Sequence, residues 1–269
     1  MSETKFGTIG LIHGSGHRAE HWDLLVPELQ ARGYNTIAVD LPAYEPDATY
    51  DDYARVAAEA FRPAVEDGQR IDLVPHSGGS HTIPGIVRRL GTDAIRSITH
   101  ISGSLGKSAN TNPRDLAPTV IPKIPLQRNS ETFRQATLRL DDGMTVFDPA
   151  MIRRLFFNDC PPEVFIWALE RMRVQAKPKD EPPIIAHTRY EIPQSYILGE
   201  DDQIRDKDWA IRAAGVLGME LVWMKGGHSP AIARPAELAD VIDDRIQRAV
   251  SSEDTIILSN YLPRQTIVK

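Results

Sequence analysis

The N-terminal part of the chain alternates short, almost continuously apolar runs with segments of helical character. The apolar runs are Thr8–His13, Thr36–Asp40, Ile71–Val74 and Ile95–Ile101. The helical segments between them are Trp22–Leu29, Tyr53–Ala64 and Gly79–Leu90. Strands that are apolar on both faces and separated by helices are typical of a parallel sheet covered by helices on both sides. The sequence therefore predicts an α/β fold with a mostly parallel, doubly wound sheet.

This alternation stops after Ser104 and resumes at about residue 193. The interruption is rich in proline and contains predicted helices at Pro149–Phe157 and Glu163–Arg173. After it come strands at Gln194–Leu198 and Glu220–Met224 and helices at Asp206–Leu217 and Pro235–Val250. We therefore expect a core (1–103 and 193–250), an inserted helical lid (104–192) and an apolar C-terminal tail (251–269). The tail could contact a neighbouring subunit in a homo-oligomer or fold back on its own core.

Ser77 lies where the third predicted strand passes directly into a helix, in the sequence Val74-Pro-His-Ser-Gly-Gly79. Such a turn strains the serine backbone and requires small residues two positions away. Gly79 meets this requirement, whereas Pro75 departs from the usual glycine. Free N–H groups at the start of a helix can stabilise a developing oxyanion. The pattern indicates a nucleophilic serine.

A serine hydroxyl becomes a good nucleophile only when a base takes its proton and a carboxylate orients that base. Asp202 follows the strand Gln194–Leu198, with Asp201 beside it as an alternative, and His228 follows the last predicted strand. Parallel strands that end at the same sheet edge converge on one crevice. The sequence therefore predicts that Ser77, Asp202 and His228 meet as nucleophile, acid and base.

A glycine-rich turn, His13-Gly-Ser-Gly-His17, follows the first predicted strand. The backbone N–H of Ser15 in this turn could reach the same oxygen as the N–H of Gly78. Two donors aimed at one oxygen would form an oxyanion hole.

Two other interpretations of this turn lead to different functions. Gly14-Ser-Gly-His-Arg-Ala19 matches a dinucleotide-binding pattern, with Asp40 at the end of the next strand. The spacing of His13, His17 and His21 could suggest a metal site. The first interpretation leaves the serine, aspartate and histidine unexplained, and the glycines would break the helix that the second requires. We expect neither a cofactor nor a metal.

These residues resemble the α/β-hydrolase superfamily, and within it the branch of plant methylesterases and hydroxynitrile lyases. The motifs that carry the resemblance are His13-Gly-Ser-Gly-His17 with Trp22, Asp40-Leu41, His76-Ser-Gly-Gly79, Asp159-Cys-Pro-Pro-Glu163, Gly199-Glu-Asp-Asp202, Gly226-Gly-His228 and Arg234-Pro-Ala-Glu237. The resemblance covers Ile9 to about Arg245 and implies an α/β-hydrolase fold.

By this resemblance, Ser77 is the nucleophile, Asp202 the acid and His228 the base, while Ser15 and Gly78 form the oxyanion hole. Hydroxynitrile lyases carry a lysine after the base and a threonine after the histidine of the first strand. Here these positions are Ser229 and Gly14, which disfavours cyanohydrin cleavage. Gly78 replaces a bulkier residue, so that the substrate has more space there.

The resulting expectation is a serine hydrolase that cleaves a carboxylic ester or lactone of a small apolar or aromatic compound through an acyl-enzyme. Candidate pocket residues are His17, His76, Phe147, Phe156 and Trp167. A protein that keeps these residues but only binds a ligand, or turns it over slowly, is an alternative. A dinucleotide-binding oxidoreductase is a third possibility.

Composition argues against several other classes of protein. The chain of 269 residues has 31 Lys+Arg against 37 Asp+Glu, a net charge of −6, and no basic run, so we expect no nucleic-acid partner. It has neither a signal-like N-terminus nor an apolar stretch long enough for a membrane span. A single cysteine, Cys160, fits a reducing compartment. We therefore expect a cytoplasmic location.

Overall fold

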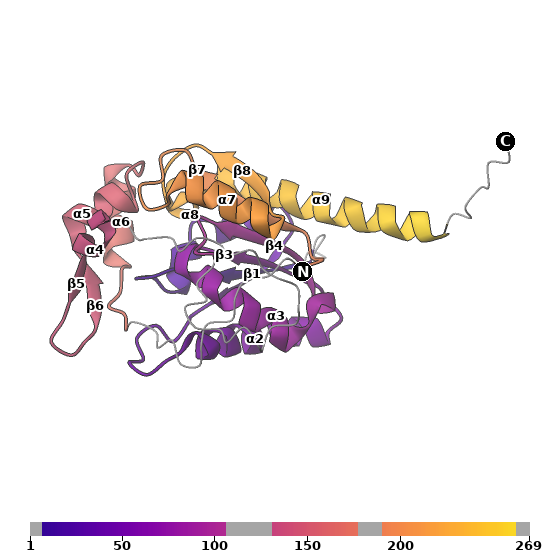
Figure 1. Ribbon diagram of the computed structural model, residues 1–269, viewed down its shortest axis with the longest axis horizontal. Helices are drawn as coiled ribbons and strands as arrows, with labels where there is room; N and C mark the ends of the chain where they lie inside the picture. The colour runs from indigo at the N-terminus through magenta and orange to yellow at the C-terminus, as the bar shows by residue number, and fades with distance from the viewer. Residues whose placement is uncertain (1–6, 106–130, 177–189, 262–269) are drawn as a thin grey trace.

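The computed structural model describes residues 7–105, 131–176 and 190–261. Within these ranges six strands form one sheet in the order β2-β1-β3-β4-β7-β8 (Figure 1). They are β1 (Thr8–Ile12), β2 (Asn35–Val39), β3 (Ile71–Pro75), β4 (Ile95–Ile101), β7 (Gln194–Gly199) and β8 (Glu220–Met224). All neighbouring pairs in this sheet are parallel. The strand bounds lie within one residue of those predicted, and the parallel sheet is confirmed.

Helices cover both faces of this sheet. One face carries η1 (Ala19–Trp22), α1 (Val26–Ala31) and α9 (Pro235–Tyr261), and the other carries α2 (Tyr50–Glu66), α3 (Ile83–Leu90) and α7 (Lys207–Leu217). Short helices η2 (Ser77–Thr82), η3 (Thr92–Ala94) and α8 (Pro230–Ala233) complete this part of the fold. Consecutive strand residues such as Leu73 and Val74 belong to opposite core clusters, because side chains alternate across a strand. The sheet is therefore doubly wound, as predicted.

Local sequence signals set the ends of the helices. Thr49 and Asp52 form a reciprocal capping box at the start of α2, with the backbone N–H of Asp52 bonded to Thr49 Oγ1 at 3.1 Å. Asp206 caps the start of α7, and Gly218, with a φ of 68°, ends it in the left-handed conformation.

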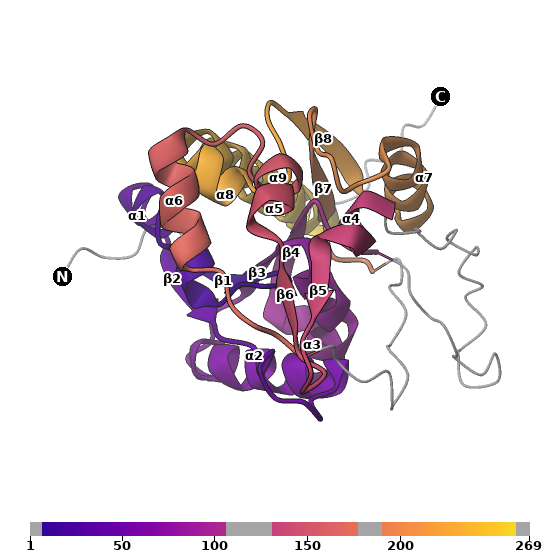
Figure 2. The same cartoon turned by 90° about the vertical axis from the view of Figure 1, so that its left-hand side faces the viewer.

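The inserted segment lies at one end of the molecule (Figures 1 and 2). Its described elements are α4 (Glu131–Ala136), β5 (Thr137–Arg139), β6 (Thr145–Phe147), α5 (Pro149–Leu155) and α6 (Pro162–Glu170). Two backbone hydrogen bonds join it to the loops after β1 and β2, from Arg173 N to Gly16 O at 2.9 Å and from Ala176 N to Ala43 O at 2.7 Å. The segment therefore covers the edge of the sheet where the strands end.

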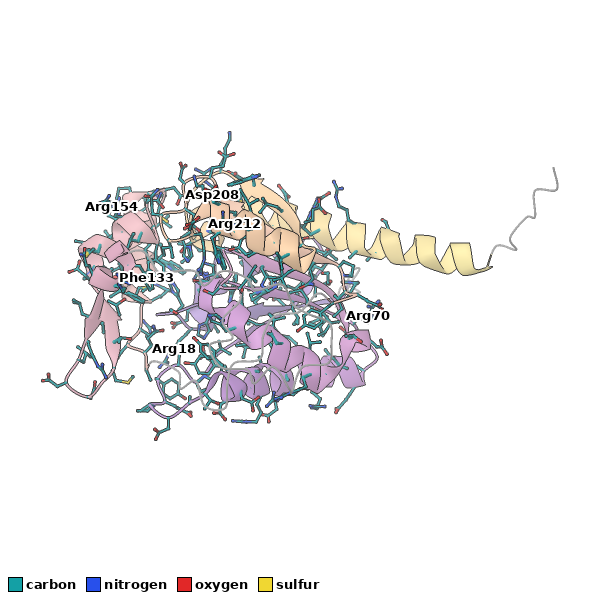
Figure 3. The ribbon with its side chains drawn as sticks, viewed as in Figure 1. Arg18, Arg70, Phe133, Arg154, Asp208 and Arg212 are labelled. Carbon is teal, nitrogen blue, oxygen red and sulfur yellow. The ribbon has the colours of Figure 1, made fainter. Side chains whose placement is uncertain are left out.

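Helices α5 and α6 agree with the prediction, but the antiparallel hairpin of β5 and β6 does not. Three-residue strands are too short for an alternating apolar pattern to be recognised. Phe133 of α4 (Figure 3) packs against Phe147 and Phe156, with ring centroids 5.8 and 6.0 Å apart. These aromatic contacts hold the hairpin and α5 together.

The last helix is longer than the sequence analysis suggests. The expected end at Val250 is too early, because α9 continues to Tyr261 and its extension reaches beyond the rest of the fold (Figure 1). No proline follows before Pro263, and serines at 251 and 252 do not stop a helix.

Some of the predicted division of the chain is not tested. Residues 106–130 and 177–189 of the inserted segment and residues 262–269 of the tail lie outside the described residues, and so do the side chains of 252–261. The boundaries of core, lid and tail, and a subunit contact by the tail, stay predictions. No helix in the described ranges is long and apolar enough to cross a membrane.

The last residue of β7, Gly199, packs closely against the loop that follows β8, and substitution of two glycines tests this packing. A Cβ at Gly199 would collide with the carbonyl oxygen of Gly227, whereas a Cβ at Gly215 of α7 would meet nothing within 4 Å. Gly199→Ala should lower the free energy of unfolding by about 1–3 kcal/mol. Gly215→Ala should raise it by about 0.5–1 kcal/mol, because alanine favours a helix. Urea unfolding of both variants measures the difference, and equal effects would contradict this packing.

Candidate active site

Ser77 follows β3 directly and is the first residue of η2. Its φ of 47° lies in the left-handed region, which is strained for a residue with a side chain. A Cβ at Gly79 would collide with the backbone carbonyl of His13, so the turn requires glycine at this position. The sharp strand-to-helix turn predicted around Ser77 is therefore present.

The three residues predicted to meet at the sheet edge are joined by hydrogen bonds. His228 Nε2 lies 3.0 Å from Ser77 Oγ, and His228 Nδ1 lies 2.9 Å from Asp202 Oδ2. The side chains of Asp202 and His228 are both fully buried. Asp201, the alternative acid, is exposed, so Asp202 is the carboxylate that orients the imidazole. With Nδ1–H donating to Asp202, Nε2 is left to accept the proton of the serine hydroxyl.

The Asp202 carboxylate is held ionised by donors from several loops. Burial alone would raise its pKa, but His228 and the hydrogen bonds outweigh burial and hold the pKa well below its usual range. Ser102 Oγ donates to Oδ2 at 2.7 Å, and the backbone N–H groups of Ile204 and Arg205 donate to Oδ1 at 2.8 and 3.0 Å. The carboxylate is thus fixed as an acceptor that points at the imidazole.

Sequence analysis did not identify two of these residues, Ser102 and Arg205. Ser102 follows β4 with a φ of 45°, the same strained conformation as Ser77. The Arg205 side chain extends from the loop after β7, and its Nη2 lies 3.2 Å from Ser77 Oγ. The available signal was position alone, because both residues follow strands that end at the same sheet edge.

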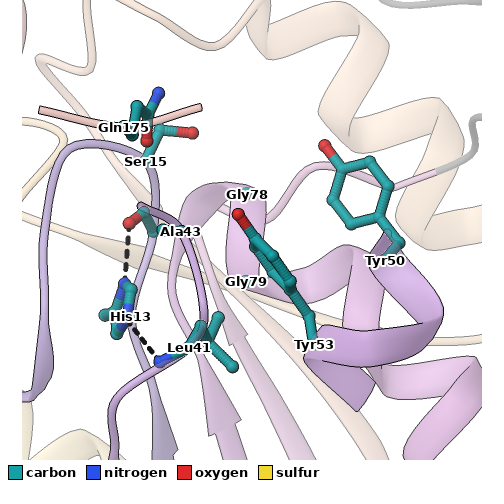
Figure 4. Close-up of a pocket in the computed structure, with 10 residues that line it drawn as sticks. His13, Ser15, Leu41, Ala43, Tyr50, Tyr53, Gly78, Gly79 and Gln175 are labelled. Carbon is teal, nitrogen blue, oxygen red and sulfur yellow. Dashed lines mark hydrogen bonds between the residues drawn. The ribbon is translucent and has the colours of Figure 1, made fainter. Parts of the chain in front are cut away.

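Ser15 and Gly78, the predicted oxyanion donors, lie beside each other. A Cβ at Gly78 would lie 3.0 Å from Ser15 Oγ and 3.7 Å from Ser15 N, so the two backbones approach closely because residue 78 has no side chain. Both line a small pocket beside the nucleophile turn (Figure 4). The other lining residues are His13, Gly14, Leu41, Ala43, Tyr50, Tyr53, Gly79 and Gln175.

The five predicted pocket residues are not equally close to this site. The Phe156 ring meets His228 edge-on, with centroids 5.3 Å apart, and Phe147 packs on Phe156 at 5.2 Å. His76 donates from Nε2 to the backbone oxygen of His228 at 2.9 Å, and His17 is buried near Phe156. Trp167 instead stacks against the guanidinium of Arg171 at 4.1 Å. Phe156 and His76 therefore contact His228 directly, and Phe147 and His17 pack on Phe156. Trp167 packs within the inserted segment.

The competing interpretations of the N-terminal turn gain no support. Asp40 Oδ1 accepts a hydrogen bond from Ala19 N at 2.6 Å, and Gly16 N donates to Gln175 Oε1 at 2.6 Å. The groups that would bind a dinucleotide therefore bind the protein itself. In the described ranges, no group of three or more His, Cys, Asp or Glu side chains is arranged so that it could hold a metal ion.

Three buried histidines, His17, His21 and His76, pack together next to His228. His21 stacks on His76 with centroids 4.6 Å apart and lies 4.4 Å from His17. Neither ring nitrogen of His21 has a hydrogen-bond partner among the described residues. Burial, reinforced by neighbouring histidines, lowers the pKa of His17 to about 3 and lowers the pKa of His21 and His76 well below the usual value. The cluster is therefore neutral in the folded protein.

This cluster predicts that the protein loses stability in mild acid. Each of these histidines takes up a proton below about pH 6.5 only when the chain unfolds, so the unfolded state binds more protons and stability falls as pH falls. Each contributes at most about 1.4 kcal/mol per pH unit. His21→Phe should reduce the slope of unfolding free energy between pH 6 and 5 by about 1 kcal/mol per unit, measured by urea unfolding. An unchanged slope would contradict a neutral His21.

Comparison with known proteins identifies the family of the chain. Residues 11–241 match the alpha/beta hydrolase family. Over 255 residues the chain is 24% identical to the alpha/beta hydrolase nvfD of Aspergillus novofumigatus, covering 89% of this chain and 96% of that protein. It is 26% identical to a pyrethroid hydrolase of Sphingobium wenxiniae over 255 residues, covering 87% and 85% of the two chains.

The fold also resembles that of a plant methylesterase. The crystal structure of the methylesterase MES16 from Arabidopsis superimposes with a TM-score of 0.63 and 18% identity, covering 91% of this chain and 98% of the other. Because the family match spans residues 11–241, most of the chain, the chain belongs to the alpha/beta hydrolase family.

Proposed function

We propose that this protein is a serine hydrolase that cleaves a carboxylic ester or lactone of a small, partly apolar compound through an acyl-enzyme. The observation that carries the proposal is the hydrogen-bond chain from Ser77 Oγ through His228 to Asp202, with distances of 3.0 and 2.9 Å. A buried base between a serine hydroxyl and a carboxylate is the arrangement that activates a serine nucleophile. By their names, one relative hydrolyses pyrethroids and a structural neighbour is a methylesterase, which supports hydrolytic chemistry here.

In the first half of the proposed reaction, His228 Nε2 takes the proton of Ser77 as Oγ attacks the ester carbonyl. The backbone N–H groups of Ser15 and Gly78 stabilise the oxyanion that forms. The imidazolium, stabilised by Asp202, then gives its proton to the leaving alcohol. The products of this half are the alcohol and an ester of Ser77.

In the second half, His228 activates a water molecule that attacks the acyl-enzyme. The same two N–H groups stabilise the second oxyanion, and the proton returns to Ser77 as the acid leaves. The inserted segment acts as the lid in this proposal, since Phe156 contacts His228 and gives the site an apolar wall. No metal or cofactor is needed for either half.

Replacing Ser77 tests the proposal. Ser77→Ala should lower the turnover of p-nitrophenyl acetate by at least about 10⁴-fold, because no other group replaces the nucleophile. The substitution removes one oxygen atom, so the circular dichroism spectrum and the melting temperature should stay close to those of the parent protein.

Retained turnover in this variant would contradict the serine mechanism. Absence of turnover in the parent protein with p-nitrophenyl acetate and a panel of other esters would instead favour a protein that only binds its ligand.

A further inference from the structure

Arg205 places a buried positive charge directly on the proposed nucleophile. Its residue is only 5% exposed, and its Nη2 donates to Ser77 Oγ at 3.2 Å and to Ser104 Oγ at 2.7 Å. Its Nε donates to the backbone oxygen of Ser102 at 2.6 Å. The guanidinium is therefore held in one orientation by residues that follow β4.

The backbone of Arg205 is fixed as firmly as its side chain. Its N–H donates to Asp202 Oδ1 at 3.0 Å, so the loop that supplies the acid also supplies the cation. Ser104, the other acceptor of Nη2, is only partly buried, so this end of the guanidinium lies closer to the protein surface than the Asp202 side chain. A rigid, partly desolvated guanidinium is well suited to bind an anion.

The charge of Arg205 lies beside the buried Asp202 carboxylate, whose pKa it helps to lower. Its contact with Ser77 Oγ changes in the course of the proposed reaction. A hydrogen bond from a guanidinium draws electron density from Oγ and makes the resting serine a weaker nucleophile. Once Oγ has become an ester oxygen, it is a poor hydrogen-bond acceptor, and Nη2 gains from a new acceptor nearby. A carboxylate on the acyl group, a few bonds from the ester carbonyl, lies within reach of the same guanidinium.

We propose that Arg205 makes the site selective for esters that carry a carboxylate close to the ester carbonyl, such as half-esters of short dicarboxylic acids. This inference rests on the proposed function and adds the substrate class to it. The carboxylate binds Nη2 in place of Ser77 Oγ, and no covalent bond to Arg205 forms. The apolar remainder of the substrate lies against Phe156, which covers His228.

The test compares two substrates of the same shape, monomethyl succinate and methyl succinamate, which differ only in a carboxylate replaced by a neutral amide. The parent protein should hydrolyse monomethyl succinate with a kcat/KM at least about tenfold higher, as expected for one charge-assisted hydrogen bond. Arg205→Gln should reduce this ratio to about 1, and Arg205→Lys should give an intermediate ratio because it keeps the charge but loses the fixed geometry. Arg55→Gln, at an exposed arginine paired with Glu59 on α2, should leave the ratio unchanged.

A ratio near or below 1 in the parent protein, or the same high ratio in Arg205→Gln, would overturn the inference and leave Arg205 as a purely structural brace. If Arg205→Gln does not fold, calorimetry of the parent protein decides, since succinate should bind at least about tenfold more tightly than succinamide. Equal binding would overturn the inference.

The failure of this inference can be told apart from the failure of the proposed function. If methyl succinamate is hydrolysed by the parent protein and not by Ser77→Ala, the serine mechanism stands whatever the ratio. If neither ester is hydrolysed, the proposed function lacks support, and the binding of succinate against succinamide still decides whether Arg205 binds carboxylates.

Discussion

The arrangement at the sheet edge depends on keeping the Asp202 carboxylate charged inside the protein. Burial disfavours the charged form of this carboxylate. The charged form is stabilised by His228, by Ser102 Oγ and by the backbone N–H groups of Ile204 and Arg205. These donors come from the loops after β4, β7 and β8, so a single carboxylate ties three strand ends together. The strained φ of Ser102 is explained by this role, because the turn aims its hydroxyl at Asp202. A neutral aspartic acid would accept a weaker hydrogen bond from His228 Nδ1–H. The imidazole would then be freer to turn.

The inserted segment is joined to the same loops by contacts that leave little space. Asn158 Nδ2 donates to the backbone oxygen of Asp201 at 3.1 Å, and Asp159 Oδ2 pairs with Arg234 Nε at 3.2 Å. Any side chain at Gly226 or Gly227 would collide with these two residues. The residues after α5 therefore pack on the backbone segments that carry Asp202 and His228. This contact links the position of Phe156 over His228 to the position of His228 itself.

The sequence predicted the parts of this molecule that leave a local pattern. The six strands leave continuous apolar runs, and Ser77, Asp202 and His228 each follow such a run in the order expected for the fold. Ser102 also follows such a run, but nothing in the local sequence indicates the side-chain contacts of Ser102 and Arg205, because these join residues about 100 or more positions apart. The hairpin of β5 and β6 is too short for periodicity. Between Val250, the expected end of the last helix, and its observed end at Tyr261 the sequence has no glycine or proline, and the first proline is Pro263. Sequence patterns do not indicate side-chain contacts between distant residues, and they place a helix end poorly where no glycine or proline lies close to it.

The central claim is that Ser77 is a nucleophile activated by His228 and Asp202. The most direct measurement is peptide mapping by mass spectrometry after reaction of the native protein with a fluorophosphonate, which forms a stable phosphonyl ester with an activated serine. The account predicts one adduct, on Ser77, and a much slower reaction in His228→Ala. Modification at another residue, or equal labelling of native and heat-unfolded protein, would contradict it.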